Sequence, residues 1–158
     1  MECNEILFDS DVDDWSKDTS VFDEKVFKQE QLIFLIEDED GQKFGFYLDG
    51  IIMSYNRDLP GDDNSFCFNL QSNGRLDRPM KFEVLKSKIF KTNVYHLYPN
   101  VDKNLIRIGD IYLYKKNWKN QSFCQQDCFD YHNIEKAISG KCEMECINPK
   151  RILVIQLI

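Results

Sequence analysis

The alternation of apolar and polar residues is clearest over residues 32–48, LIFLIEDEDGQKFGFYL. Five apolar residues run without a break over 32–36, which is typical of a strand covered on both faces. A polar turn at 37–41 follows, and apolar residues then recur at every second position over 44–48, as in a strand with a single apolar face. Glycine accepts a positive φ, so Gly41 after an aspartate predicts an antiparallel hairpin here.

The same period of two predicts further short strands along the chain. We expect them at residues 5–8, 66–70, 80–84, 106–108 and 111–114, with weaker signals at 89–90 and 94–97. Within residues 66–70, the side chains of Phe66, Phe68 and Leu70 share one face, and Cys67 and Asn69 share the other. Aromatic residues in such strands most often belong to the core, so we expect Phe44, Phe66 and Phe82 to be core residues.

Two short helices are predicted between the strands. The first covers about residues 19–27 and would be capped by Ser16 or Asp18, because a side-chain oxygen there accepts from an unpaired backbone N–H. The second covers 134–139 and would end at Gly140. Residues 54–64 and 117–131 are interpreted as loops or irregular connections.

The last segment, RILVIQLI at 151–158, carries apolar residues on both faces and predicts a central strand. Many short antiparallel strands with few helices predict an α+β, mainly β, fold. We expect two antiparallel sheets packed as a sandwich and flanked by short helices, in a single domain over residues 1–158.

Composition and charge narrow the function. The chain has 158 residues and a net charge of −7. Residues 1–66 hold 18 acidic and 5 basic residues, whereas 67–158 hold 9 and 15. One interpretation is that the halves interleave and neutralise each other; the other is an acidic face that meets a basic partner. The charge disfavours nucleic acid as a partner. The apolar runs are too short for membrane insertion, and the polar N-terminus lacks the pattern of a secretory signal. A cytoplasmic location follows as the expectation.

The order of segments resembles the TLDc domain of the oxidation-resistance proteins. That family has an Asp-Gly-Trp-Ser-like segment, a Phe-Gly-Gly-Phe strand, a Phe-Leu-Phe-Ser-Leu strand, a Lys-Phe strand and a Gly-Asp-Ile-Tyr segment before a Leu-Ala-Gly-like helix end. The matching stretches here are 11–16, 43–47, 65–70, 80–82, 109–113 and 138–140. The family's glycine-rich run is reduced to Gly109, and its paired glutamates in the last strand have no counterpart in residues 152–156. No activity tied to those glutamates is therefore carried over.

The resemblance implies the same sandwich of two antiparallel sheets. It also implies a role in oxidative-stress resistance and, as in several members, binding to the vacuolar proton pump, a membrane-associated assembly. We expect a protein–protein interaction or regulatory domain with no cofactor and no enzymatic activity. For a basic partner, the candidate binding residues are the acidic positions of the first third, Asp9, Asp11, Asp13, Asp14, Glu37, Asp38, Glu39 and Asp40.

Cysteine spacing supports an alternative from another class. Two pairs with three residues between their members flank a histidine, which gives Cys124, Cys128, His132, Cys142 and Cys146 as candidate zinc ligands. The same thiols could instead carry redox chemistry, because Lys141 beside Cys142 would lower the pKa of an exposed thiol. Inert cysteines in a reducing compartment are the third interpretation.

Other chemistry is weakly specified. Asp9, Asp11 and Asp13 imitate the start of a calcium loop, but Asp14 stands where glycine is needed and Ser20 where the bidentate glutamate is needed. An acidic turn before a helix is the better account. A nucleophile pair of Cys128 with His132 would lack a third orienting group.

Overall fold

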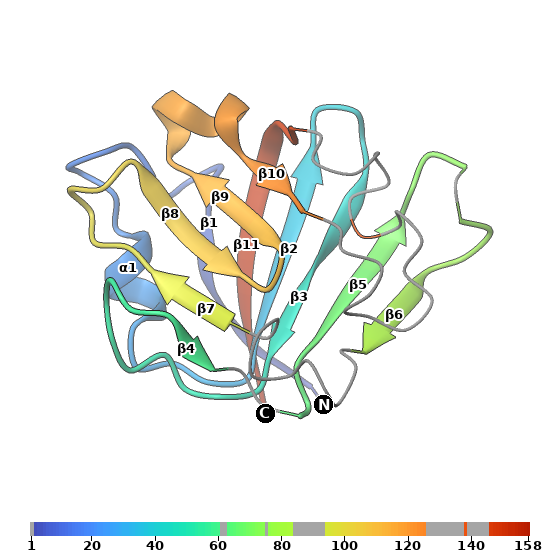
Figure 1. The fold of residues 1–158 in the computed structure, drawn as a ribbon, viewed down its shortest axis with the longest axis horizontal. Coiled ribbons are helices and arrows are strands. Elements are labelled where there is room, and N and C mark those ends of the chain that lie inside the picture. The colour runs from blue at the N-terminus through green and yellow to red at the C-terminus, as the bar shows by residue number, and fades with distance from the viewer. Residues whose placement is uncertain (1, 61–62, 75, 84–93, 126–137, 139–145) are drawn as a thin grey trace.

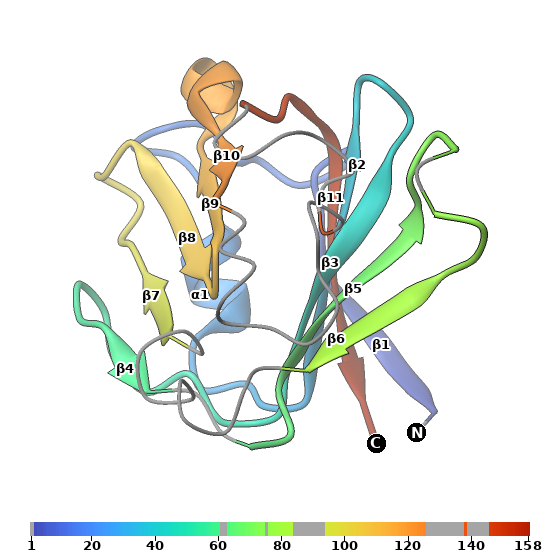
Figure 2. The ribbon, with the colours of Figure 1, turned by 45° about the vertical axis from the view of Figure 1, so that its right-hand side comes forward.

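Two antiparallel sheets face each other in the computed structural model, which describes residues 2–60, 63–74, 76–83, 94–125, 138 and 146–158. Figure 1 shows the sheets one behind the other, and Figure 2 shows the space between them from the side. Both sheets pair their neighbouring strands in antiparallel fashion. The predicted mainly β sandwich with short helices is therefore confirmed.

The larger sheet has six strands in the order β1-β11-β2-β3-β5-β6. Their bounds are β1 (Cys3–Asp9), β2 (Leu32–Asp38), β3 (Lys43–Leu48), β5 (Phe66–Gln71), β6 (Met80–Glu83) and β11 (Pro149–Leu157). The C-terminal strand β11 lies between β1 and β2, as its two apolar faces predict.

The smaller sheet has five strands in the order β10-β9-β8-β7-β4. They are β4 (Leu59–Pro60), β7 (Val94–Leu97), β8 (Asn104–Ile108), β9 (Ile111–Tyr114) and β10 (Phe123–Cys124). Gly109 takes a positive φ of 54° in the tight turn from β8 to β9. A 3₁₀ helix, η2 (Lys116–Gln121), leads into β10, so the expected irregular connection after residue 117 begins with regular structure.

The core fills the space between the sheets. The six-stranded sheet contributes fully buried side chains such as Phe34, Phe44 and Ile152, and the five-stranded sheet contributes Ile108 and Ile111. These residues belong to one continuous cluster. Burial of this apolar area is the main driving force for folding.

The first predicted helix is shorter than expected. Helix α1 (Phe22–Val26) begins three residues later than the predicted position 19. Neither Ser16 nor Asp18 directly precedes it: Asp18 takes a positive φ of 70°, and it is Ser20 Oγ that accepts from the backbone N–H of Phe22 at 3.2 Å. Residues 16–19 form a turn, so the helix cannot begin at residue 19.

The hairpin of β2 and β3 is confirmed, with Gly41 at a φ of 80°. The expected burial of its two strands is wrong, however. In β2 only alternate residues are buried, so Ile33 and Leu35 stay half-buried, whereas β3 is buried on both faces from Phe44 to Leu48. The reason is position: β3 is flanked by the large outer side chains of β5, whereas the outer face of β2 is left open.

Strand β5 faces the opposite way from the prediction, because its apolar side lies on the outer face of the sheet. Cys67 and Asn69 point into the sandwich and are 0% and 1% exposed, whereas Phe66 is half-buried and Leu70 is 46% exposed on the outer face. The core assignment is thus wrong for Phe66 but right for Phe44 and Phe82, which are fully buried. Because Cys67 pairs with Phe82, β5 must turn Cys67 inward for Phe82 to reach the core.

Several expectations lie outside the described residues, namely the strand at 89–90 and the helix at 134–139. Within the described part of the chain, none of the helices has the length and apolar character needed to cross a lipid bilayer.

Candidate functional site

The outer face of the six-stranded sheet carries a row of apolar side chains that crosses five strands. Residues that pair directly across antiparallel strands point to the same face. The register pairs Ile6 with Ile155, Ile155 with Ile33, Ile33 with Tyr47, and Tyr47 with Phe66. All five side chains therefore line up from β1 to β5.

A second row lies two residues further along the strands. Leu153 pairs with Leu35, Leu35 with Gly45, and Gly45 with Phe68. At Gly45 an added Cβ would lie 2.7 Å from Phe68 Cζ and 1.9 Å from the carbonyl oxygen of Phe34. The missing side chain lets the Phe68 ring lean over β3, which leaves Phe68 only 9% exposed.

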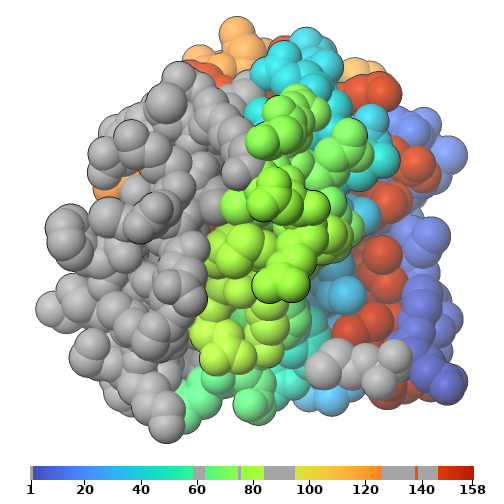
Figure 3. Space-filling model, turned by 90° about the vertical axis from the view of Figure 1, so that its right-hand side faces the viewer, coloured from blue at the N-terminus to red at the C-terminus, as the bar shows by residue number. Residues whose placement is uncertain are grey.

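We call these two rows together with Leu70 the apolar belt: Ile6, Ile33, Leu35, Tyr47, Phe66, Phe68, Leu70, Leu153 and Ile155. A hollow of about 500 Å³ opens along it, lined almost entirely by apolar atoms of belt residues and of Pro79, Met80 and Lys81. Figure 3 looks onto this side of the molecule, where the colours pass from the green of β5 and β6 through the cyan of β2 and β3 to the red of β11 and the blue of β1.

One end of the belt is acidic. Asp49, Asp63 and Glu83 gather there with Lys81 around a smaller hollow of about 340 Å³ that also touches Tyr47 and Phe66. We call Asp49, Asp63 and Glu83 the acidic end. Lys81 Nζ lies 2.9 Å from Glu83 and 4.2 Å from the centroid of the Phe66 ring.

Hydrogen bonds from two neighbours hold the Asp49 carboxylate at the acidic end. Asn64 Nδ2 donates to its carboxylate at 2.9 Å, and the Tyr47 hydroxyl donates at 2.7 Å. These hydrogen bonds hold the pKa of Asp49 below its usual value, although burial opposes them. The carboxylate therefore stays charged at neutral pH.

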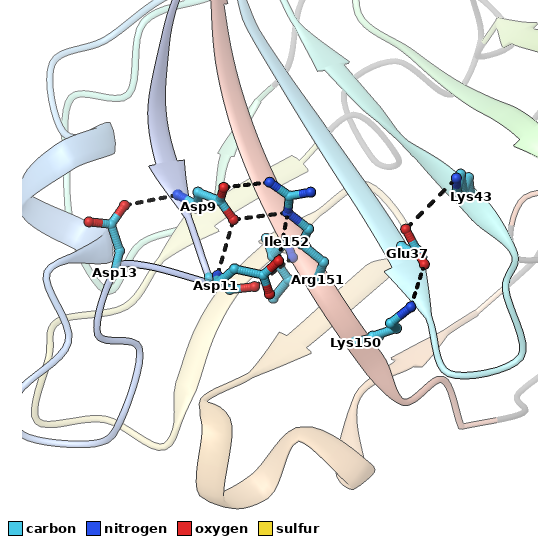
Figure 4. Close-up of polar contacts among 9 residues, drawn as sticks. Asp9, Asp11, Asp13, Glu37, Lys43, Lys150, Arg151 and Ile152 are labelled. Carbon is cyan, nitrogen blue, oxygen red and sulfur yellow. Dashed lines mark hydrogen bonds and ion pairs between the residues drawn. The ribbon is translucent and has the colours of Figure 1, made fainter.

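The opposite end of the belt is a charged row of Arg151, Glu37 and Lys43, which pair across β11, β2 and β3. Glu37 lies 3.0 Å from Lys150 and 3.8 Å from Lys43. The hydrogen bond from Lys150 is the main reason why the pKa of Glu37 is lowered. Figure 4 shows this row, with Glu37 between its two lysines.

Arg151 ties the loop after β1 to the same row. Its guanidinium donates to Asp9 at 2.6 and 3.0 Å and lies 3.2 Å from Asp11 (Figure 4). The two-pronged hydrogen bond lowers the pKa of Asp9 and raises that of Arg151. Acidic residues of the first half thus meet basic residues of the second half, in agreement with the interleaved interpretation of the charge pattern.

Each of the remaining predicted acidic residues makes a contact of its own. Asp13 contacts Lys25 at 2.7 Å, and Glu39 contacts Lys119 at 2.9 Å. The Asp14 carboxylate accepts from Ser16, and its pKa is lowered chiefly by a hydrogen bond from Thr19. Asp38 is buried and accepts from the backbone N–H of Gln42. The exposed Asp40 accepts from Asn73 through its carbonyl oxygen.

Most of the candidate zinc ligands, Cys128, His132 and Cys142, lie outside the described residues. Of the other two, Cys124 is buried and Cys146 is exposed. Cys146 forms an isolated bridge with Phe123, the residue before Cys124. Within the described ranges, no group of three or more histidine, cysteine and acidic side chains is arranged to hold a metal ion.

A separate polar cluster lies on the outer face of the five-stranded sheet. His96 Nδ1 is 2.9 Å from Asp58, which also faces Arg107 at 3.7 Å. The His96 ring stacks on Tyr98 with 4.1 Å between centroids, and Arg107 lies over Tyr112. These contacts hold the histidine in one orientation on the sheet.

The sequence interpretation missed the belt because it assigned the apolar side of β5 to the core. The signal was present in the pairing of β5 with β6. Lys81 and Glu83 must face water in β6, so their partners Phe68 and Phe66 face outward as well.

The fold is that of a class of proteins with two antiparallel sheets, in which the last strand of the sequence, here β11, lies inside the larger sheet. The chain belongs to the TLDc domain family, because the family model for the TLDc domain matches residues 1–144 of its 158 residues. Among curated proteins, none matches the chain significantly. The family resemblance inferred from the order of the segments is thereby confirmed.

Proposed function

We propose that this TLDc chain is a non-catalytic interaction module that docks a protein partner through the apolar belt. The observation that carries the proposal is the exposed apolar surface itself. Leu70 is 46% exposed and Ile6 is 56% exposed, at opposite sides of a sheet face whose centre is also apolar. A contiguous apolar surface in contact with water typically marks an interaction site.

The biological role follows from the family. By resemblance, the docked partner would belong to the cell's defence against oxidative stress, and the vacuolar proton pump is the assembly that several family members bind. A cytoplasmic domain would meet such a membrane-associated assembly from its soluble side.

The predicted acidic residues have a secondary part in this proposal. Asp9, Asp11 and Glu37 already face Arg151 and Lys150, so a basic partner must compete with those ion pairs. Exposed ion pairs are weak and are screened by salt. We therefore assign them to the rim of the docking surface, where they tune the association rate more than the affinity.

The test compares two substitutions in host cells that lack their own copy of this protein. Leu70→Asp places a charge in the belt, and Val101→Asp places one at a position that is 63% exposed in a loop after β7. Peroxide survival and acidification by the vacuolar pump are measured in both, after thermal unfolding has shown that both variants fold.

We expect Leu70→Asp to abolish the complementation and Val101→Asp to retain it. Full protection by Leu70→Asp would refute docking through the belt. Loss of peroxide survival with normal pump acidification would retain the docking module and remove the pump as its partner.

A further inference from the structure

We infer that the partner presents an amphipathic α-helix whose apolar side fills the belt and whose basic residues lie over the acidic end. This inference rests on the proposed docking function and adds the chemistry of the partner. It is carried by the position of the belt between two ends of different charge.

The belt offers side chains and not backbone groups. Its central strands β11, β2, β3 and β5 are each hydrogen-bonded to a strand on either side. An extended segment that adds to a sheet needs an edge with unpaired backbone groups. A partner on this face must therefore satisfy its own backbone internally, as a helix does.

The dimensions suit a helix. From Lys43 to Asp49 along β3 the face measures about 20 Å, at roughly 3.4 Å per residue. A helix of about 14 residues has the same length at 1.5 Å per residue. Its side chains at every third or fourth position would fall on the two apolar rows, the usual mode in which a helix lies in an apolar groove.

A small apolar ligand fits less well. Pockets for such ligands usually bury most of the ligand surface. Here Ile33, Leu35 and Ile155 are only half-buried along the open hollow. A ligand lying on them would leave one side in water, whereas a helix would turn its own polar side to the solvent.

The charges select a basic segment. Among the described residues that line it, the acidic end holds three carboxylates and the ammonium group of Lys81. Hydrogen bonds keep Asp49 ionised at neutral pH. Lysine or arginine side chains would lower the repulsion among these carboxylates, and an acidic segment would raise it. The opposite end is balanced by its own ion pairs.

A second copy of the chain is a poorer occupant by the same reasoning. In the described part of the chain, the cations around the belt already face carboxylates: Lys81 faces Glu83, Lys43 and Lys150 face Glu37, and Arg151 faces Asp9. Self-association would have to break these pairs in both copies.

The experiment uses the full chain and two designed helical peptides of about 14 residues. Both peptides carry the same leucines at helical spacing, and one has three lysines near its C-terminus where the other has three glutamates. Affinities are measured by titration calorimetry at low and high salt, and sedimentation of the chain alone reports self-association.

We expect the lysine peptide to bind about tenfold more tightly than the glutamate peptide, as three exposed charge pairs allow. Adding salt should narrow the difference. The double variant Asp63→Lys, Glu83→Lys should reverse the preference. Leu70→Asp should weaken both peptides, and Val101→Asp should weaken neither.

Equal affinity of the two peptides would contradict a basic partner. A lysine preference that persists in the Asp63→Lys, Glu83→Lys variant would contradict it as well. Binding of neither peptide, or self-association that Leu70→Asp removes, would overturn the helix. In these cases the proposed docking function would still stand if Leu70→Asp fails to protect cells while Val101→Asp protects them. Full protection by Leu70→Asp would instead refute the docking function itself.

Discussion

The inner and outer faces of the six-stranded sheet are built from the same strands, yet only the inner face is covered by the second sheet. The inner face carries Phe34, Phe44 and Val154, which are fully buried against the second sheet. The outer face carries Ile33, Leu35 and Phe66, which belong to rows paired across neighbouring strands in the same manner but are only half-buried and line an open hollow. Both faces carry rows of apolar side chains, so an apolar pattern alone does not tell which face forms the core.

Strand β5 makes the difference visible within six residues. Its inward side has Cys67 and Asn69, and Asn69 donates from Nδ2 to the carbonyl of Ile138 at 2.7 Å. Its outward side has two phenylalanines and a leucine. A polar side chain can be buried when it is hydrogen-bonded, and the outward Phe66 and Leu70 remain in part accessible to solvent. Their presence there agrees with the proposed docking surface.

The largest expected effect comes from the inner face. Phe34→Ala removes a fully buried ring and should cost about 3–5 kcal/mol of unfolding free energy. Phe66→Ala removes a half-buried ring from the outer face and should cost only about 1–2 kcal/mol. Urea denaturation of both variants measures the difference. Equal costs would mean that the outer face is as important for folding as the core, and the comparison would fail.

The next largest loss of stability is expected at Gly45, where the packing of β3 leaves no room for a side chain. Gly45→Ala would place its Cβ against the backbone carbonyl of Phe34 and the ring of Phe68. We expect a loss of about 3 kcal/mol, the upper range for overpacking. Gly41→Ala is the matched control, since space is open around Gly41 and only its φ of 80° is unfavourable. Thermal unfolding should show a smaller loss for Gly41→Ala than for Gly45→Ala, and the reverse order would contradict the tight packing of β3.

The smallest effect concerns the charged rim. The folded-state pKa of Asp9 is depressed by Arg151, so the pair stabilises the fold above the usual aspartate pKa of about 3.9 and loses this contribution as the pH falls further. Arg151→Gln should therefore be less stable than the wild type at pH 7, and the gap should close in acid. Adding Arg151→Gln to Asp9→Asn should cost less than Arg151→Gln alone, because only the contact of Arg151 with the exposed Asp11 is then left to lose. A gap that is constant with pH would exclude this ion pair as its cause.

Much of the fold could be predicted from the sequence. The hairpin of β2 and β3, the strands β8 and β9, and the central place of β11 follow from local alternation and from Gly41 and Gly109 as turn residues. These signals are local, because each depends on neighbouring residues and on the φ that glycine accepts.

The site could be predicted only in part. The acidic residues are visible in the sequence, but their partners Arg151, Lys150 and Lys119 lie 80 or more residues away in the chain. The belt was hidden for another reason: a period of two shows which residues share a face, but not which face meets the second sheet. Only the register of β5 with β6, where Lys81 and Glu83 demand solvent, resolves that choice.

The most direct test of the outer face as a docking surface is a methyl NMR spectrum of the chain with and without the lysine peptide. We predict chemical-shift changes at Ile33, Leu35, Leu70, Leu153 and Ile155 of the belt, and little change at the inward Leu32, Ile36 and Val154. No change when the peptide is in large excess would contradict the helical basic partner, and changes centred on the five-stranded sheet would contradict the docking surface proposed for this TLDc domain.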